Sequence, residues 1–295
     1  MMSMHYALGA DIGGTHIEAV RVSAGRRVLG KARVQLPAEK GRELVASKLV
    51  ECLEEVRGDG KPLAIGLAVP GIIKGGVVKA SPNLPFLRSA RFVPLMKLRF
   101  GAPALVENDV NCMAYGEWVR RRTGNLLAMT LGTGIGGGII ADGKLYRGRA
   151  FAGEVGHITL DFDGPMGKCG NPGCLEEYAS IKSVRRLAER FLGRPMEPKE
   201  IYGLALGGNA KALSVWREYG RVLGIGLSTL CYVLDPELIV LGGGISGAFR
   251  FFGAPMREEM RKRMFIPLPK IVQGKDGANA FGAACLAMDS INTKN

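Results

Sequence analysis

The residues from Asp11 to Thr15, in the order Asp-Ile-Gly-Gly-Thr, lie between the apolar runs Tyr6–Ala10 and Ile17–Val22. This spacing predicts a hairpin turn and not a Walker loop, which would need a following Gly-Lys-Ser/Thr and a helix. The backbone N–H groups of such a turn can face phosphate oxygens together with the Thr15 hydroxyl. The Asp11 carboxylate can hold a water of a magnesium ion beside them. The alternative is an ordinary hairpin without a ligand.

A second glycine-rich turn, Gly132–Gly138, lies between the apolar runs Leu126–Leu131 and Ile139–Ala141. Five of its seven residues are glycine, and a two-residue hairpin turn does not need so many. We therefore interpret the two turns together as groups that hold a triphosphate from both sides. The run Gly242-Gly243-Gly244 follows a third apolar strand and allows a further close backbone approach, which we assign to the adenosine end of the nucleotide.

The acidic run Glu107-Asn108-Asp109 stands where the apolar strand Ala104–Val106 ends and a helix is expected to begin. Asn or Asp at this place often only caps the helix. An Asp at the carboxyl end of a strand also faces the region where α/β folds bind their ligands. We expect Asn108 to cap the helix and Asp109 to accept a proton from an attacking hydroxyl while MgATP supplies the phosphoryl group.

A possible metal site involves His157, Cys169 and Cys174, since the chain has only three histidines and two of its cysteines lie close to this one in sequence. A structural zinc site needs four nitrogen or sulfur ligands, and only three are present in this segment. A metal-free loop with two free thiols is the alternative.

The remaining pattern predicts a duplicated α/β fold, because both glycine-rich turns connect apolar strands. We expect one domain at 1–115, completed by a C-terminal helix at 279–295, and a larger one at 116–278, with a cleft between them. The other predicted strands are Arg27–Val34, Leu63–Val69 and Leu238–Leu241, and the predicted helices are Glu43–Val56, Val110–Arg122, Ile181–Phe191, Ala210–Leu234 and Asn279–Met288.

The composition excludes several classes of protein. The net charge of +13 comes from dispersed basic clusters without an aromatic platform, so we expect a solvated surface that attracts nucleotides and no specific nucleic-acid binding. Six cysteines in 295 residues do not make a disulfide framework. No secretion signal or membrane span is evident, and we expect a cytoplasmic protein.

In this order along the chain, the motifs resemble those of the ROK family of sugar kinases, a branch of the actin-like ATPase superfamily that also contains hexokinases. The resemblance covers nearly the whole chain. It rests on these segments: Asp11–Thr15, Val69–Gly71, Ser81–Pro85, Glu107–Asn111, Gly132–Gly138, Glu154–His157 and Gly173–Glu176. The resemblance implies two duplicated α/β domains of the actin-like ATPase (ribonuclease H-like) type.

The resemblance also implies a role for each matching residue. Asp109 would be the base on the sugar hydroxyl, and Asp11 would serve the nucleotide with its Mg²⁺. The other sugar hydroxyls would bind Asn83, Asn108, Glu154, His157 and Glu176. The phosphates would bind Gly13, Gly14, Thr15, Gly132, Thr133 and Gly134, and the nucleoside Gly243 and Gly244.

Two residues depart from the family pattern. The family usually has Lys where this chain has His16, so we assign His16 no role. The first cysteine of the family's zinc motif falls at Gly167, with Asp161 or Asp163 as conceivable substitutes. We therefore expect the loop to fold without tightly bound zinc and His157 to serve the sugar alone.

The implied function is an ATP-dependent hexokinase or glucokinase acting on the 6-hydroxyl of its sugar, as a homodimer or homotetramer. An N-acetylmannosamine or N-acetylglucosamine kinase is an alternative within the same class. A sugar-responsive transcription repressor is an alternative from another class. We do not favour it, because the ten residues before Asp11 are too few for a helix-turn-helix domain and both glycine-rich turns are intact.

Overall fold

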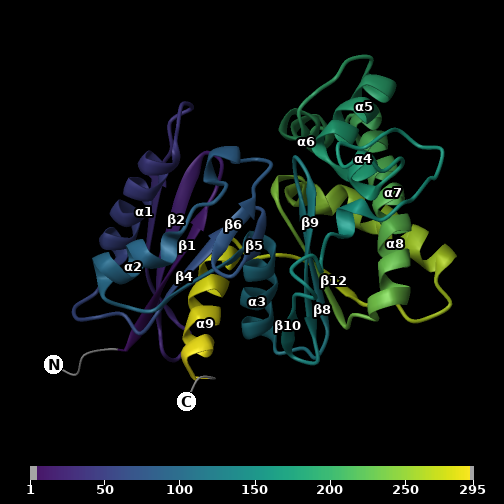
Figure 1. Cartoon of the computed structure of the whole chain (residues 1–295). Helices are drawn as coiled ribbons and strands as arrows, with labels where there is room; N and C mark the ends of the chain where they lie inside the picture. The colour runs from purple at the N-terminus through teal and green to yellow at the C-terminus, as the bar shows by residue number, and fades with distance from the viewer. Residues whose placement is uncertain (1–4, 293–295) are drawn as a thin grey trace. The chain divides into compact units, whose positions relative to one another are not determined.

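The structure is a computed structural model that describes residues 5–292 (Figure 1). The chain divides into two compact units, each with its own hydrophobic core. The first unit contains residues 1–122, 143–151 and 275–295, and the second contains residues 123–142 and 152–274. The chain therefore returns to the first unit at its C-terminal end.

The sheet of the first unit has five strands in the order β3-β2-β1-β4-β7. The first three strands run antiparallel, and β1, β4 and β7 run parallel. The predicted hairpin around Gly13 and Gly14 is confirmed as β1–β2, and the predicted third strand as β3. The bounds are β1 (Tyr6–Ile12), β2 (His16–Ser23), β3 (Val28–Gln35), β4 (Ile65–Val69) and β7 (Ala104–Asn108).

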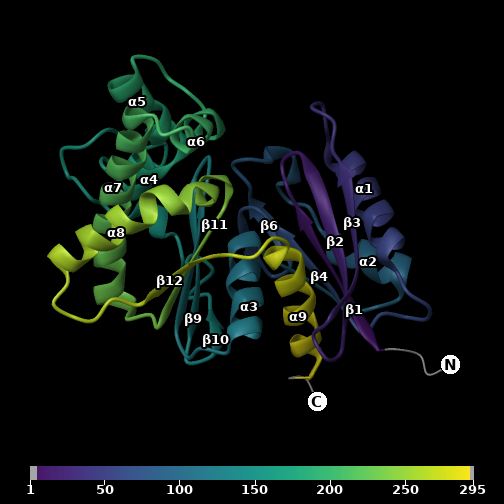
Figure 2. The same cartoon turned by 180° about the vertical axis from the view of Figure 1, so that it is seen from behind.

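Helices cover both faces of this sheet, with α1 and α2 on one face and α3 and α9 on the other (Figures 1 and 2). The C-terminal helix lies very close to the strands. A Cβ at Gly9 would come 2.0 Å from the carbonyl oxygen of Ala280, and one at Gly66 would come 1.9 Å from that of Ala283. The bounds are α1 (Arg42–Val56), α2 (Phe92–Phe100), α3 (Asp109–Arg121) and α9 (Ala278–Asn292), with the short elements β5 (Ile72–Lys74), β6 (Val77–Ala80) and η1 (Pro85–Leu87).

The second sheet repeats this order as β10-β9-β8-β11-β12. Strands β8 and β9 are antiparallel, while β8, β11 and β12 are parallel. Strand β9 begins at Ile135 and not at Ile139 as predicted, so the second glycine-rich turn is limited to Gly132–Gly134 and the glycines 136–138 pair with β8. The bounds are β8 (Leu126–Leu131), β9 (Ile135–Ala141), β10 (Lys144–Tyr146), β11 (Leu238–Gly242) and β12 (Lys270–Gln273). The predicted duplication of an α/β unit is therefore confirmed.

The helices of the second unit pack around the long helix α7, which lies beside α8 (Figure 1). Trp216 and Tyr219 of α7 and Phe252 of α8 are fully buried, and their rings meet at 5.1 to 6.4 Å. The bounds are η2 (Val155–His157), α4 (Leu175–Ala179), α5 (Ile181–Leu192), α6 (Pro198–Leu206), α7 (Ala210–Leu234), η3 (Gly244–Ala248) and α8 (Phe249–Arg263).

The predicted elements are found within a few residues of their expected ends. Strand β7 runs on to Asn108, two residues beyond the predicted end at Val106, and β4 begins at Ile65 and not at Leu63. The sequence pattern did not predict β12 or α8, which contains Pro255.

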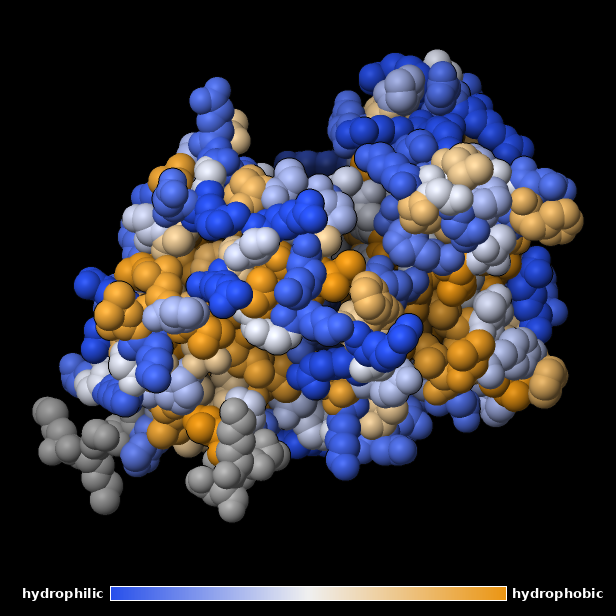
Figure 3. Space-filling model, in the orientation of Figure 1, coloured by the Kyte–Doolittle hydropathy of each residue, from blue (hydrophilic) through white to orange (hydrophobic). Residues whose placement is uncertain are grey.

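The surface is strongly hydrophilic over α4 to α6, as the blue residues in Figure 3 show. Basic residues there and on α7 pair with acidic neighbours: Arg185 contacts Glu197 at 2.6 Å, and Arg221 contacts Glu218 at 2.8 Å. Within residues 5–292, no helix combines the length and the apolar character that crossing a bilayer requires.

Candidate functional site

The first glycine-rich turn connects β1 to β2 and is open to solvent. The Gly13 amide donates to the His16 carbonyl at 3.0 Å, and the Leu36 amide donates to the Thr15 carbonyl at 2.8 Å. Gly14 and Thr15 are exposed, and a Cβ at Gly14 would meet no atom within 4 Å. Within the described residues, the amides of Gly14 and Thr15 have no acceptor. The turn therefore has the free donors that an anion site needs.

His16 lies beside the hydroxyl of this turn. Its Nδ1 is 3.0 Å from Thr15 Oγ1 and 3.2 Å from Nη2 of Arg33. Because a guanidinium can only donate, Nδ1 acts as the acceptor. Burial of the ring, and then the Arg33 charge, lower the pKa of His16. The neutral ring can hold the Thr15 hydroxyl in place, a contact that the sequence analysis did not assign.

Asp11 and Asp109 bring two carboxylates together at the carboxyl ends of β1 and β7. Removal from water raises the pKa of Asp11 to about 8, and repulsion by Asp109 and by Glu18 adds to this shift. Asn279 acts in the opposite direction and lowers the pKa of Asp11, because its Nδ2 donates a hydrogen bond to Asp11 Oδ2 at 3.1 Å. Two neighbouring carboxylates are a donor set that suits Mg²⁺, which prefers oxygen ligands and retains its waters.

Asn108 caps helix α3, as predicted. Its Oδ1 accepts from the amides of Val110 at 2.9 Å and Asn111 at 3.0 Å. Its Nδ2 donates to the carbonyl oxygen of Gly71 at 3.0 Å. The amide keeps one further N–H for a ligand, and the cap fixes where α3 begins and hence where Asp109 stands.

Glu107 anchors the same strand-to-helix turn and was missed by the sequence analysis. Its side chain is buried, and its Oε2 contacts Nε of Arg147 at 2.6 Å. Its Oε1 accepts from the Asn108 amide at 2.9 Å and from Nδ2 of Asn111 at 3.0 Å. The only sequence signal was its place directly before Asn108 and Asp109. Arg147 lies forty residues further along the chain, and no local pattern connects it to Glu107.

Asn83 is exposed in the turn between β6 and η1 of the first unit. The turn is closed by a hydrogen bond from the Leu84 amide to the Ser81 carbonyl at 3.1 Å. The Ser81 hydroxyl is buried, and no described residue forms a hydrogen bond with it. Exposure leaves the Asn83 amide available for a polar ligand.

The second glycine-rich turn is braced by neighbouring residues of its own unit. The Ile135 amide donates to Oε2 of Glu176 at 2.9 Å, and the Ile181 amide donates to the Gly132 carbonyl at 2.8 Å. Thr133 at its tip is exposed. The structure therefore connects Glu176, which we expected at the sugar, directly to the turn expected at the phosphates.

Gly243 and Gly244 follow β11 but differ in their surroundings. Gly243 has a φ of +81°, and a Cβ there would come 2.5 Å from the Leu131 carbonyl oxygen. A Cβ at Gly244 would meet no atom within 4 Å. Packing against β8 requires glycine at position 243, whereas the space beside Gly244 is open.

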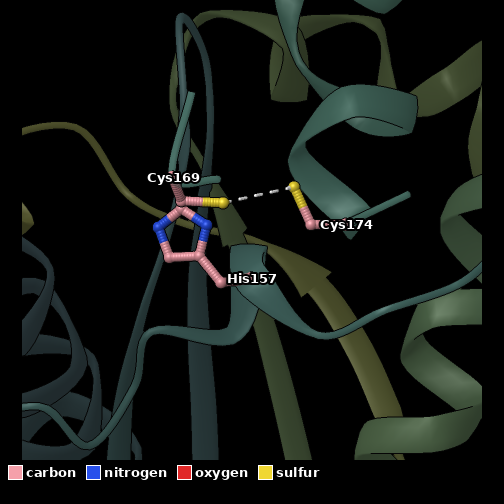
Figure 4. Close-up of side chains that lie close together, drawn as sticks. All are labelled: His157, Cys169 and Cys174. Atoms are coloured by element: carbon pink, nitrogen blue, oxygen red, sulfur yellow. Dashed lines mark hydrogen bonds between the residues drawn. The ribbon is translucent and has the colours of Figure 1, made fainter. Parts of the chain in front are cut away.

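His157, Cys169 and Cys174 form one cluster, in which the potential ligand atoms lie within 4.8 Å of one another (Figure 4). The two sulfur atoms are 4.0 Å apart. The Nδ1 of His157 is buried and has no hydrogen-bond partner among residues 5–292, and its Nε2 lies 3.7 Å from a carboxylate oxygen of Glu154. These three residues fit three positions of a zinc site.

Gly167 occupies the place of the fourth ligand. A Cβ there would lie 2.9 Å from the Cys174 sulfur and 3.2 Å from the Cys169 sulfur. Among residues 5–292, the cluster includes neither Asp161 nor Asp163. Asp161 instead accepts a hydrogen bond from the Tyr178 hydroxyl at 2.9 Å. The donor set is one ligand short of a closed structural site.

Comparison with known proteins agrees with this geometry. The ROK family profile matches residues 7–290. The chain is 32% identical to a glucokinase of Thermotoga maritima over 86% of each chain. It resembles a ROK hexokinase structure from Thermus thermophilus with a TM-score of 0.83 and 32% identity, over 98% of this chain and 99% of that one. A Streptomyces griseus ROK family glucokinase solved with glucose and AMPPNP gives a TM-score of 0.81 and 30% identity, over 96% and 99%. The fold is the α/β fold of the actin-like ATPases.

Proposed function

Because this chain belongs to the ROK family, we propose that it is an ATP-dependent hexokinase or glucokinase that phosphorylates the 6-hydroxyl of glucose or a related hexose. The observation that carries the proposal is the pair Asp11 and Asp109. Both stand at the carboxyl ends of parallel strands, and Asp11 leads directly into a turn with free backbone donors. Glucokinases among the relatives support the reaction class.

In the proposed reaction, the oxygen of the sugar hydroxyl attacks the γ-phosphorus and ADP leaves, while Asp109 accepts the proton of that hydroxyl. Glu107 and Asn108 fix the start of α3, and with it the position of this carboxylate. Asp11 would hold a water of the Mg²⁺ ion, which supplies positive charge to the phosphates when bound. Its raised pKa indicates that the unliganded site favours a cation or a proton.

The sugar would be recognised by polar side chains. Their hydrogen bonds would select among epimers, since a buried polar group left unpaired by the wrong sugar costs ~1–3 kcal/mol. The proposed set is Asn83, Asn108, Glu154, His157 and Glu176. The proposed phosphate contacts are Gly13, Gly14, Thr15, Gly132, Thr133 and Gly134, and the nucleoside would lie at Gly243 and Gly244.

We also propose that no zinc is tightly held, and that the chain forms a homodimer or homotetramer. The missing fourth ligand at Gly167 supports the first statement. Light scattering behind a sizing column would test the second.

The test is an ADP-release assay with glucose, mannose, fructose, N-acetylmannosamine and N-acetylglucosamine. We expect release with glucose or another unmodified hexose. ADP release confined to the N-acetyl sugars would instead support an N-acetylmannosamine or N-acetylglucosamine kinase. No release with any sugar, together with sugar-dependent binding to a specific DNA sequence, would favour a repressor.

A further inference from the structure

A lysine from outside the sequence motifs lies at the first glycine-rich turn. Lys40 belongs to the segment between β3 and α1, and its side chain is half-buried. Its Nζ donates to the Gly14 carbonyl oxygen at 2.5 Å and to the Pro37 carbonyl oxygen at 3.2 Å. These two contacts hold the ammonium group against the turn whose amides are free.

The chemistry of this ammonium group matches that of the turn. An ammonium has three N–H donors, and two of them are used by the carbonyls of Gly14 and Pro37. The third N–H is left for a ligand, beside the free amides of Gly14 and Thr15 and the Thr15 hydroxyl. The ammonium group also brings a full positive charge to this set of donors. Such a set of donors around a concave turn is suited to a highly charged anion.

The residues Gly13, Gly14 and Thr15 of the turn carry no positively charged side chain that could bind such an anion. The ring of His16 accepts from Arg33, and its pKa is lowered by burial and by that guanidinium, so it is neutral near pH 7. The Arg33 guanidinium donates to this ring and not to the Gly14 carbonyl. Among the residues that the structure describes, Lys40 is therefore the cation that touches the backbone of the turn itself.

We propose that Lys40 binds the terminal phosphates of ATP at the Gly13-Gly14-Thr15 turn, as a nucleotide-binding residue that the motifs do not contain. The inference rests on the proposed function, because it takes this turn to be a phosphate site. It predicts that Lys40 strengthens the binding of ATP more than the binding of AMP, since a point charge at the turn acts on the triphosphate tail and not on the nucleoside.

The test compares Lys40→Met with the charge-preserving Lys40→Arg. Lys48→Met is the matched control, because Lys48 lies on the adjoining helix α1 and pairs with Glu51 at 2.7 Å. The measurements are KM for MgATP, KM for the sugar, kcat, and calorimetric affinity for ATP and for AMP. We expect Lys40→Met to raise KM for MgATP by about 10- to 100-fold, the usual effect of losing a charge-assisted hydrogen bond.

The expected pattern also separates phosphate binding from mere support of the turn. AMP affinity, KM for the sugar and Tm should stay at wild-type values in Lys40→Met, Lys40→Arg should recover most of the ATP affinity, and Lys48→Met should behave as wild type. Equal losses for ATP and AMP with a lowered Tm would overturn the assignment in favour of a structural contact.

Failure of this inference differs from failure of the kinase proposal. If the wild type phosphorylates a sugar and Lys40→Met keeps its affinity for ATP, only the assignment of Lys40 is wrong. If the wild type itself releases no ADP with any sugar and does not bind ATP, the proposed function fails and the inference with it.

Discussion

The two halves of the molecule have sheets with the same strand order, but different side chains lie at equivalent positions of the two sheets. Asp11 lies opposite Ala68 on the neighbouring parallel strand, and Thr130 lies opposite Gly242 in the same way. Each residue stands two positions before the first glycine of its turn. At equivalent places, the first half therefore has a carboxylate and the second a neutral hydroxyl.

The turns themselves differ in the same sense. The first turn is open, and Lys40 and Arg33 lie next to it. The second turn is packed, and the carboxylate of Glu176 bonds to its backbone. The two copies therefore share a scaffold, but cationic side chains lie beside the first turn and a carboxylate is bonded to the second. We infer that the first half performs proton transfer and that the second mainly positions the ligand.

The strongest test of this division is Asp109→Asn. It should lower turnover by ~10²–10⁴ because the amide cannot accept the proton, while sugar affinity stays nearly unchanged. Steady-state kinetics and calorimetry with the sugar would measure both. Asp59→Asn, which removes an exposed carboxylate from the same unit, is the control and should retain wild-type kcat. Wild-type kcat in Asp109→Asn would remove this residue from the role of base.

The contrast between the two glycine-rich hairpins can be tested with two glycines, Gly14 in the first turn and Gly137 in β9 beside the second. A Cβ at Gly137 would come 2.5 Å from the Gly153 carbonyl oxygen and 2.6 Å from Val155, whereas a Cβ at Gly14 would meet nothing. Gly137→Ala should therefore cost ~1–3 kcal/mol of stability through overpacking. Gly14→Ala should leave Tm almost unchanged and raise KM for MgATP. Thermal unfolding of both variants measures this, and equal Tm losses would show that the two hairpins are not different.

The buried acid of the first half predicts a pH dependence of stability. The folded protein holds the Asp11 proton up to about pH 8, whereas an unfolded aspartate releases it near its ordinary value of 3.8. The free energy of unfolding should therefore fall as the pH rises from about 4, with the loss complete above about 8.

Asp11→Asn should remove this dependence. In magnesium-free buffer its Tm should match the wild type at pH 4 and exceed it increasingly up to pH 8, with activity lost. Parallel Tm curves for both proteins across this range would show that the pKa of Asp11 is not raised.

The smallest expected effect on activity concerns the metal cluster of the second half. Under reducing conditions, Gly167→Cys should bind about one zinc per chain, because it restores the fourth ligand. Gly167→Ala places a Cβ at the same point without a thiol and should bind none. Metal analysis by mass spectrometry would measure the content. One tightly held zinc in the wild type would contradict the expectation of a metal-free loop.

Local patterns predicted much of this fold and the neighbourhood of its site. The alternating strands around Gly13 and Gly132 and the apolar period of Glu43–Val56 were sufficient for the duplicated α/β architecture. Asn108 was correctly expected as a cap, because its position between a strand and a helix is a local property.

Contacts between distant segments could not be predicted in this way. Arg147 reaches Glu107, and Lys40 reaches Gly14, only after the chain has folded. The need for glycine at position 243 could not be predicted either, because a Cβ there would meet Leu131, which lies on another strand. Sequence shows which residues could do chemistry, whereas tertiary contacts decide which of them hold the others in place.

The position of helix α9 has a consequence for how the protein is made. The sheet of the first unit is built from residues near the start of the chain, yet Gly9 and Gly66 lie against the carbonyls of Ala280 and Ala283. During synthesis that face of the strands stays uncovered until the residues around Ala280 and Ala283 have left the ribosome. The second unit, whose segments lie within residues 123–274, can form first. The unit that bears Asp109 is thus completed after the second unit, so a product truncated before α9 would leave this face of its sheet uncovered.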